Sequence, residues 1–274
     1  MLSEAEPASP SSPWSSLSDP AIALENVSKQ YLLSFYKPEA LKTAILQLPA
    51  LLRRGRGRWP FWALSDINLA VRPGESLGVI GPNGSGKSTL LRIMARIAPP
   101  TKGRVTVRGR ISALLELGAG FHPQISGREN AILNAVLLGL SLKEAREVMP
   151  QIIEFSELGD FIDQPMRTYS SGMYVRLGFA VAVHIQPEVL LVDEVLAVGD
   201  TEFQRKCFSH IEKLRADNVT IVFVSHDLMA VARFCDRVIL MDHGRISFEG
   251  DAGAVIHEYL SRIARLEAAL SSSS

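Results

Sequence analysis

The sequence predicts an α/β fold around a mainly parallel β-sheet, and three observations support this prediction. Consecutive apolar residues recur in the runs VLLVD, TIVFVS and RVILMD, which is typical of parallel strands that helices bury on both faces. A fourth apolar run, SLGVI, leads into a glycine-rich loop and then into a helical stretch. Segments with helix-start signals lie between SLGVI and VLLVD, and a buried parallel sheet combined with helices indicates the α/β class.

Length and composition limit the fold and its partners. A chain of 274 residues suits one large domain or two small ones. Lysine plus arginine and aspartate plus glutamate both number 29, so no bulk charge favours nucleic acid, and we expect no nucleic-acid partner. Cys207 and Cys235 lack metal-site spacing, which predicts unpaired, buried thiols in a reducing compartment. No stretch approaches the roughly 18 uninterrupted apolar residues that span a bilayer.

The first part of the chain divides into a loose start, two β-rich stretches and an insert. Residues 1–20 are rich in serine and proline and are expected to be disordered. The stretch AIALENVSKQY alternates as a strand does, and a second β-rich stretch begins near Phe61. Between them, residues 32–60 form an insert that is apolar at first and then becomes a run of arginines broken by glycines.

Helix signals dominate the middle and the end of the chain. A helix is expected from about Lys87, then strands in GRVTVRGRISALLEL, then helices from Ser126, Ser141 and Ser171. The starts SGRE and SLKE are capping boxes, a serine followed three residues later by glutamate. Residues 251–274 are expected to form a C-terminal helix and a serine tail. A helical stripe in this segment favours packing on its own domain over a separate interaction role; its members are Ile256, Leu260, Ile263, Leu266 and Leu270.

The nonapeptide GPNGSGKST predicts a phosphate-binding loop, because it follows a buried strand and opens a helix. Its glycines let backbone amides turn inward around phosphates, Lys87 can reach the β- and γ-phosphates, and Ser88 can ligate magnesium. A chance junction between a loop and a helix is the weaker alternative. The residues of the loop are Gly81, Pro82, Asn83, Gly84, Ser85, Gly86, Lys87, Ser88 and Thr89.

Two further strand ends carry candidate catalytic groups. VLLVDE ends in Asp193, which can hold magnesium, and Glu194, which can orient or deprotonate an attacking water. Alone, such an acidic pair is often a turn, but beside a phosphate loop it predicts a hydrolytic site. FVSHD places His226 at the same carboxyl edge, where a histidine donor can sense a γ-phosphate. The alternative for His226 is a structural or surface residue.

The segment YSSGMYV opens a helix with two serines and a glycine. Ser170 or Ser171 could cap the helix, or the helix start could bind an anion through its unpaired amides and partial positive charge. These residues alone favour the cap.

Together these motifs make the chain resemble the ATP-binding subunits of ABC transporters over roughly residues 21–250. YSSGM stands where that family has its signature, commonly LSGGQ. The resemblance implies a P-loop nucleotide-binding domain with a β-rich subdomain, a mainly parallel core sheet and a helical signature subdomain at about residues 124–185. It also implies that the signature meets the ATP of a second copy of the chain, so the anion role is favoured over the cap. The signature residues are Ser170, Ser171, Gly172 and Met173.

The resemblance implies roles for two more residues and for ATP with Mg²⁺. Asp200, which ends AVGD, falls at the loop that crosses the dimer axis. Tyr31 matches the aromatic residue that stacks on adenine, although an aromatic at a strand end is more often a packing residue. Lys87, Glu194 and His226 take the catalytic roles.

Departures from the common family pattern point to a subfamily. The glutamine usual after the third strand is missing: Glu116 and Leu117 lie near its place and Gln124 comes too late, so the coupling-loop residue stays unassigned. The motifs LLELGAGFHP, TYSSGM and DEVLAVGD are similar to the exporters of O-antigen, capsule and teichoic acid. This similarity implies a homodimer at the cytoplasmic face of the bacterial inner membrane that drives a polytopic permease and so exports a lipid-linked polysaccharide.

Two other function classes share parts of this pattern. A soluble ABC-type ATPase that acts on ribosomes or nucleic acid usually carries two nucleotide domains or a long coiled coil, and this sequence has one phosphate loop and no such insertion. A P-loop kinase shares GSGKS but does not need YSSGM or VSHD.

The arginine-rich part of the insert suggests a contact with the membrane. Basic residues gain about 1 kcal/mol each near an anionic leaflet, and tryptophans favour the interfacial zone. A membrane-facing role is therefore favoured over a solvated loop and over RNA binding. The residues concerned are Arg53, Arg54, Arg56 and Arg58, beside Trp59 and Trp62.

Overall fold

The computed structural model describes residues 19–34, 58–115, 117–118, 120–193 and 200–271. The strands are β1 (Ile22–Ser34), β2 (Arg58–Val71), β3 (Ser76–Ile80), β4 (Lys102–Val107), β5 (Ile111–Leu114), β6 (Val189–Val192), β7 (Thr220–Val224), β8 (Arg237–Asp242) and β9 (Arg245–Gly250). The helices are α3 (Lys87–Met94), α4 (Gly127–Leu137), α5 (Leu142–Glu147), α6 (Met149–Ser156), α7 (Ser171–His184), α8 (Thr201–Ala216), α9 (Leu228–Phe234) and α10 (Ala252–Ser271), with 3-10 helices η1 (Gly159–Asp163) and η2 (Met166–Thr168).

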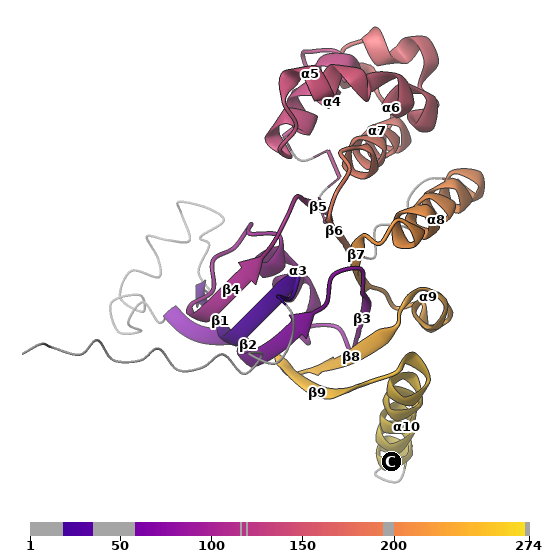
Figure 1. Cartoon of the computed structure of the whole chain (residues 1–274). Helices are drawn as coiled ribbons and strands as arrows, with labels where there is room; N and C mark the ends of the chain where they lie inside the picture. Colours follow the sequence, from indigo (N-terminus) through magenta and orange to yellow (C-terminus); the bar gives the residue numbers. More distant parts are fainter. Residues whose placement is uncertain (1–18, 35–57, 116, 119, 194–199, 272–274) are drawn as a thin grey trace, which may run out of the picture.

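Two sheets organise the chain. The larger one has the strand order β5-β6-β7-β3-β8-β9, and all its strands run parallel except β9, which pairs antiparallel with β8. The smaller one is antiparallel and has the order β2-β1-β4. Figure 1 shows the smaller sheet on one side of the molecule and the helices α4 to α7 gathered in a separate lobe. The predicted fold class, a β-rich part, a mainly parallel core sheet and a helical part, is confirmed.

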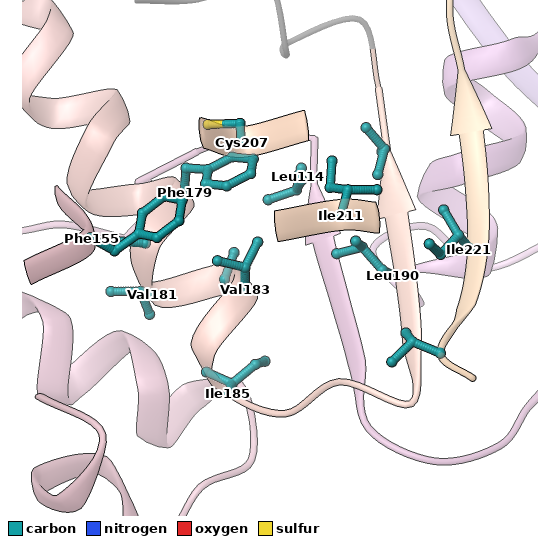
Figure 2. Close-up of a cluster of buried hydrophobic side chains, with 14 of the residues drawn as sticks. Leu114, Phe155, Phe179, Val181, Val183, Ile185, Leu190, Cys207, Ile211 and Ile221 are labelled. Atoms are coloured by element: carbon teal, nitrogen blue, oxygen red, sulfur yellow. The ribbon is translucent and has the colours of Figure 1, made fainter. Parts of the chain in front are cut away.

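The core sheet is buried on both faces, as its apolar runs predict. In β6, Val189 and Leu191 face the cluster that contains α3, while Leu190 and Val192 face the cluster built by α7, α8 and α9. Figure 2 shows Leu190 of the sheet beside Ile211 of α8. One detail of the prediction is wrong: the face toward α3 is covered by the smaller sheet as well as by a helix, because residues of β1 and β2 belong to the same buried cluster.

The helical lobe begins where the sequence signals place it. Ser126 caps α4 by accepting a hydrogen bond from the Glu129 amide at 3.2 Å, and the Glu129 carboxylate accepts from the Ser126 amide at 2.9 Å. Ser141 and Glu144 form the same reciprocal pair at the start of α5. Both predicted capping boxes are therefore confirmed.

The ends of the predicted insert differ from the observed strands. β1 continues to Ser34 and β2 already starts at Arg58, so both strands enter the segment assigned to residues 32–60. Antiparallel pairing extends each strand beyond its alternating sequence pattern. Residues 35–57, with Arg53, Arg54 and Arg56, lie outside the described residues, as do residues 1–18 and the serines 272–274. The membrane role of the insert stays a prediction.

The C-terminal helix packs on its own domain, as expected, but the face that meets the core overlaps the predicted stripe only in part. Val255 is fully buried, and Ile256 and Tyr259 pack against the core. Leu260, which belongs to the predicted stripe, is 50% exposed. The side chains of Leu266 and Leu270 are outside the described part of the chain. Among the helices that the structure describes, none combines the length and the apolar character needed to cross a bilayer.

Candidate nucleotide-binding site

The predicted phosphate loop joins the buried strand β3 to α3. Gly81 and Gly86 have positive φ angles of 142° and 106°, which favour glycine. A Cβ atom at Gly81 would lie 2.2 Å from the Met241 carbonyl oxygen, and one at Gly86 would lie 2.6 Å from that of Ala63. Neither position accepts a side chain, so the glycines of the motif are required by the loop geometry.

Lys87 points back into this loop. Its side chain is buried, and the ammonium donates to the carbonyl oxygens of Gly81 at 2.8 Å and Pro82 at 3.0 Å. The positive charge is thus held at the centre of the loop, where a bound phosphate would meet it.

The remaining loop residues divide into an anchored and an open part. The Ser85 carbonyl accepts from the Gly244 amide at 3.0 Å, which ties the loop to the turn between β8 and β9. The buried Ser85 hydroxyl has no hydrogen-bond partner among the described residues. Pro82, Asn83, Gly84 and Ser88 are exposed and Thr89 is half-buried, so the loop offers its backbone and the Ser88 hydroxyl to solvent.

Strand register brings the other motifs to the same edge of the core sheet. β7 lies between β6 and β3, with Val224 opposite Val79 and Phe223 opposite Val192. All three strands run parallel, so the residues that follow them lie at one carboxyl edge, the usual ligand site of open α/β sheets. These residues are Gly81, the half-buried Asp193 and the exposed His226. Glu194 falls in residues 194–199, outside the described residues.

The predicted signature opens α7 in the helical lobe. Ser170 is the N-cap, and its exposed hydroxyl accepts from the Met173 amide at 3.2 Å. The cap interpretation is therefore correct for the single chain, although a capping oxygen still has a proton to donate outward. Ser171 is exposed, and Gly172 and Met173 are half-buried. A Cβ atom at Gly172 would meet only the Ser170 hydroxyl at 3.8 Å, so nothing nearby in its own chain requires glycine there.

Asp200 caps α8 and pairs with the signature helix. Its carboxylate accepts from the Phe203 amide at 2.9 Å and from the guanidinium of Arg176 in α7. The backbone hydrogen bond and the Arg176 contact hold the pKa of Asp200 below its usual value. Arg176 also pairs with Glu157, 2.6 Å away, so one side chain links α7, the end of α6 and the start of α8.

Sequence reasoning missed Arg176 and its neighbour Tyr174. The Tyr174 hydroxyl donates to the Gly118 carbonyl at 2.9 Å and so connects the signature helix to the loop after β5. The sequence does contain one signal for Arg176: it lies three residues after Met173 of the predicted signature, and residues three apart share a helix face. The partners Glu157 and Asp200 are brought there only by tertiary packing.

Tyr31 lies in β1 opposite Phe61 of β2, half-buried. The ammonium of Lys29 lies 5.3 Å from the centre of the Tyr31 ring and also donates to the Pro99 carbonyl at 2.6 Å. The ring is therefore oriented by a residue tied to the segment after α3.

Comparisons with known proteins agree with this geometry. Residues 64–197 match the ABC transporter family. The O-antigen export system ATP-binding protein RfbB of Klebsiella pneumoniae is 46% identical over 246 residues, which cover 90% of this chain and 100% of that protein. The teichoic acids export ATP-binding protein TagH of Shouchella clausii is 44% identical over 88% of this chain and 65% of its own length. The dimeric ATP-binding cassette MJ0796, solved in a post-hydrolysis state with ADP and Pi, superposes with a TM-score of 0.66 at 25% identity, over 84% of this chain and 98% of that one. The chain therefore belongs to the ABC transporter family, as one of its ATP-binding, ATP-hydrolysing subunits.

Proposed function

We propose that this chain is the ATPase subunit of an exporter of lipid-linked polysaccharide, of the class that includes O-antigen and teichoic acid. The observation that carries the proposal is the 46% identity to an O-antigen export ATP-binding protein over the full length of that protein. The chain would act at the cytoplasmic face of the bacterial inner membrane and drive a separate polytopic permease. The glycan would meet the permease and only indirectly this subunit.

The roles at the carboxyl edge follow from charge and position. The amides of the loop 81–86 and Lys87 bind the phosphates of ATP, and Tyr31 stacks on adenine. His226 donates to the γ-phosphate at the end of β7, and Glu194 activates the attacking water. These groups bind the substrate and stabilise charge that develops on the transferred phosphoryl group.

Mg²⁺ fits the residues at this edge. The exposed Ser88 hydroxyl at the start of α3 and the half-buried Asp193 carboxylate after β6 are oxygen donors, which Mg²⁺ prefers. Bound there with the nucleotide phosphates, Mg²⁺ would neutralise phosphate charge. No group of three or more His, Cys, Asp or Glu side chains suited to a metal ion occurs in the described part of the chain.

Two copies of the chain complete the sites in this proposal. Two features support this part of the proposal: the space next to the Gly172 Cα is open, and the Ser170 hydroxyl is exposed. Both suit an anion that another molecule brings. Ser170 to Met173 of one copy would meet the γ-phosphate held by the other, and Asp200 would lie near the axis. ATP binding would close the homodimer, and hydrolysis would open it again.

The alternative, a soluble ATPase that acts on ribosomes or nucleic acid, has no observation in its favour. The relatives quoted above are named for export, and the charges of the chain balance at 29 of each sign. Nucleic acid is therefore not proposed as a partner.

Affinity purification and a surface assay test the proposal together. Tagged chain isolated from detergent-solubilised membranes of its native host should bring down a polytopic membrane protein. Deletion of the gene should deplete surface polysaccharide, which the wild-type gene restores and Lys87→Ala does not. Normal surface polysaccharide in the deletion strain, with no membrane protein in the purified sample, would refute an export role.

A further inference from the structure

The pairing of β1 with β2 places a second aromatic ring beside Tyr31. Tyr31 and Phe61 are directly opposite each other in the antiparallel register, so their side chains leave the sheet on the same face with Cβ atoms about 5 Å apart. Phe61 is 47% exposed and Trp59, two residues along the same strand, is 66% exposed. The described part of the chain therefore leaves much of both side chains uncovered.

An extra residue in β2 decides which face these rings occupy. Lys29 pairs with Leu64, but the next pair is Gln30 with Trp62, so Ala63 is inserted without a partner. The insertion puts Phe61 and Tyr31 on the same face as Leu64 and Lys29 rather than on the face of Trp62. Trp62 points the opposite way, where the Lys102 ammonium lies 5.5 Å from its ring centre.

The face that carries Tyr31 and Phe61 is the one that covers the phosphate loop and its helix. Leu64 on this face is fully buried in the cluster that contains Leu90 and Leu91 of α3. The inserted residue Ala63 approaches the loop itself, because its carbonyl oxygen would lie 2.6 Å from a Cβ atom on Gly86. Phe61 is therefore only two residues along the strand from the point where β2 meets the loop.

We propose that Phe61 and Tyr31 together form a two-ring platform for the adenine of the ATP bound at this loop. A purine has two fused rings and can cover two adjacent side-chain rings, and the phosphates of the same ligand reach the neighbouring amides of the loop. The proposal rests on the proposed function, since it needs the nucleotide in the loop 81–86, and it adds a residue that determines affinity for the base.

Binding measured on the full chain tests the platform with two ligands. The non-hydrolysable analogue AMP-PNP carries the base, and inorganic tripolyphosphate carries the phosphates alone. Phe61→Ala removes one stacking ring, so we expect its affinity for AMP-PNP to fall about tenfold and its affinity for tripolyphosphate to stay unchanged. Phe61→Tyr keeps the ring and should bind AMP-PNP as the wild type does.

Trp62→Ala is the matched control, an adjacent aromatic on the opposite face of the same strand, and it should leave both ligands unaffected. Equal AMP-PNP affinity in Phe61→Ala and Trp62→Ala would overturn the platform while leaving the nucleotide site intact. A parallel loss of tripolyphosphate binding in Phe61→Ala would overturn it as well, because the defect would then not lie at the base. Wild-type chain that binds neither ligand would instead refute the nucleotide site as a whole.

Discussion

Lys87 shows how one buried charge can prepare a site for its ligand. Burial of an ammonium is unfavourable unless its protons are hydrogen-bonded. Here the loop carbonyls of Gly81 and Pro82 accept from it, and these bonds hold the charge in the position where it would meet a phosphate.

We expect Lys87→Ala to abolish ATP turnover, because the γ-phosphate loses its charged partner. Phosphate release and nucleotide binding measure the effect. Lys143→Ala is the control, since the Lys143 side chain is 86% exposed and pairs with Glu147 on its own helix at 3.8 Å. Turnover that survives in Lys87→Ala would contradict the assignment of the loop.

The two cysteines give a second test at the scale of single residues. Both thiols are buried, and burial raises the pKa of Cys207 and of Cys235 to about 12. At pH 8 the reactive thiolate is then on the order of one part in ten thousand of each thiol. We expect iodoacetamide to leave the native protein unlabelled and to label both residues after denaturation in guanidinium; labelling of the native protein would show that burial does not protect them.

At the scale of elements, the phosphate loop offers two glycines that differ in their surroundings. Gly86→Ala should lower the free energy of unfolding by about 3–5 kcal/mol, because the new Cβ would clash with the Ala63 carbonyl and adopt an unfavourable φ. Gly84 also has a positive φ, of 77°, but a Cβ there meets nothing within 4 Å. Gly84→Ala should therefore cost only about 1 kcal/mol. Urea denaturation measures both variants, and equal losses would mean that crowding at Ala63 is not the cause.

The elements that could be predicted from sequence are those with local causes. Ser126 and Glu129 cap their own helix, and a run such as VLLV is buried wherever it lies in a core sheet. The phosphate loop is equally local, because its glycines and Lys87 act within one turn of chain.

The features that escaped prediction depend on segments that are distant in sequence. The bulge at Ala63 appears only when β2 is paired with β1, and it reverses which of Phe61 and Trp62 faces the loop. Leu260 fits the predicted helical stripe, yet it is half exposed, and the core meets α10 through Val255, Ile256 and Tyr259. Periodicity finds an apolar face but does not give its rotation against the partner.

At the scale of the whole molecule, a mixed polar and aromatic junction joins the helical lobe to the core domain. Phe155 of α6 meets Phe179 of α7 and Phe203 of α8, with ring centres 5.8 Å apart in both pairs. Figure 2 shows Phe155 and Phe179 at this junction near Cys207. The contact of Arg176 with Asp200 lies on the same elements, so a movement of the signature helix would be transmitted to the start of α8.

Two histidines at this junction predict a loss of stability in mild acid. Burial lowers the pKa of His184. Burial, together with the nearby His184 ring, also lowers the pKa of His210. The His210 Nε2 atom has no hydrogen-bond partner among the described residues. Protonation therefore favours the unfolded chain. The free energy of unfolding is largest above pH 6.5, the ordinary pKa of histidine, and it decreases as the pH falls from 6.5 toward the lowered pKa values of the two histidines in the folded chain. The Lys206 and Arg176 contacts lower the pKa of Glu157, so the stability that this carboxylate contributes is lost mainly below its ordinary value of 4.5, at the acid end of this range.

We expect the free energy of unfolding to fall by about 1 kcal/mol between pH 7 and pH 5, and to fall less in His210→Phe, which keeps a ring but cannot be protonated. Urea titrations across this range measure both proteins. The same pH dependence in His210→Phe would place the cause elsewhere.

The proposed dimer makes a prediction that no single chain can satisfy. If the signature of one copy completes the site on the other, Lys87→Ala and Gly172→Asp are each inactive alone, the second because a carboxylate would repel the phosphate. Mixed dimers, however, contain one site with an intact loop facing an intact signature. A random equal mixture should therefore regain about a quarter of wild-type ATP turnover, since half of the dimers are mixed and each mixed dimer has one intact site of two.

Lys87→Ala mixed with Glu194→Gln is the control and should stay inactive, because these two residues are assigned to the same site of one chain. Subunit exchange is verified by co-purification of differently tagged copies, and exchange without recovery in the first mixture would mean that the signature does not act across the dimer.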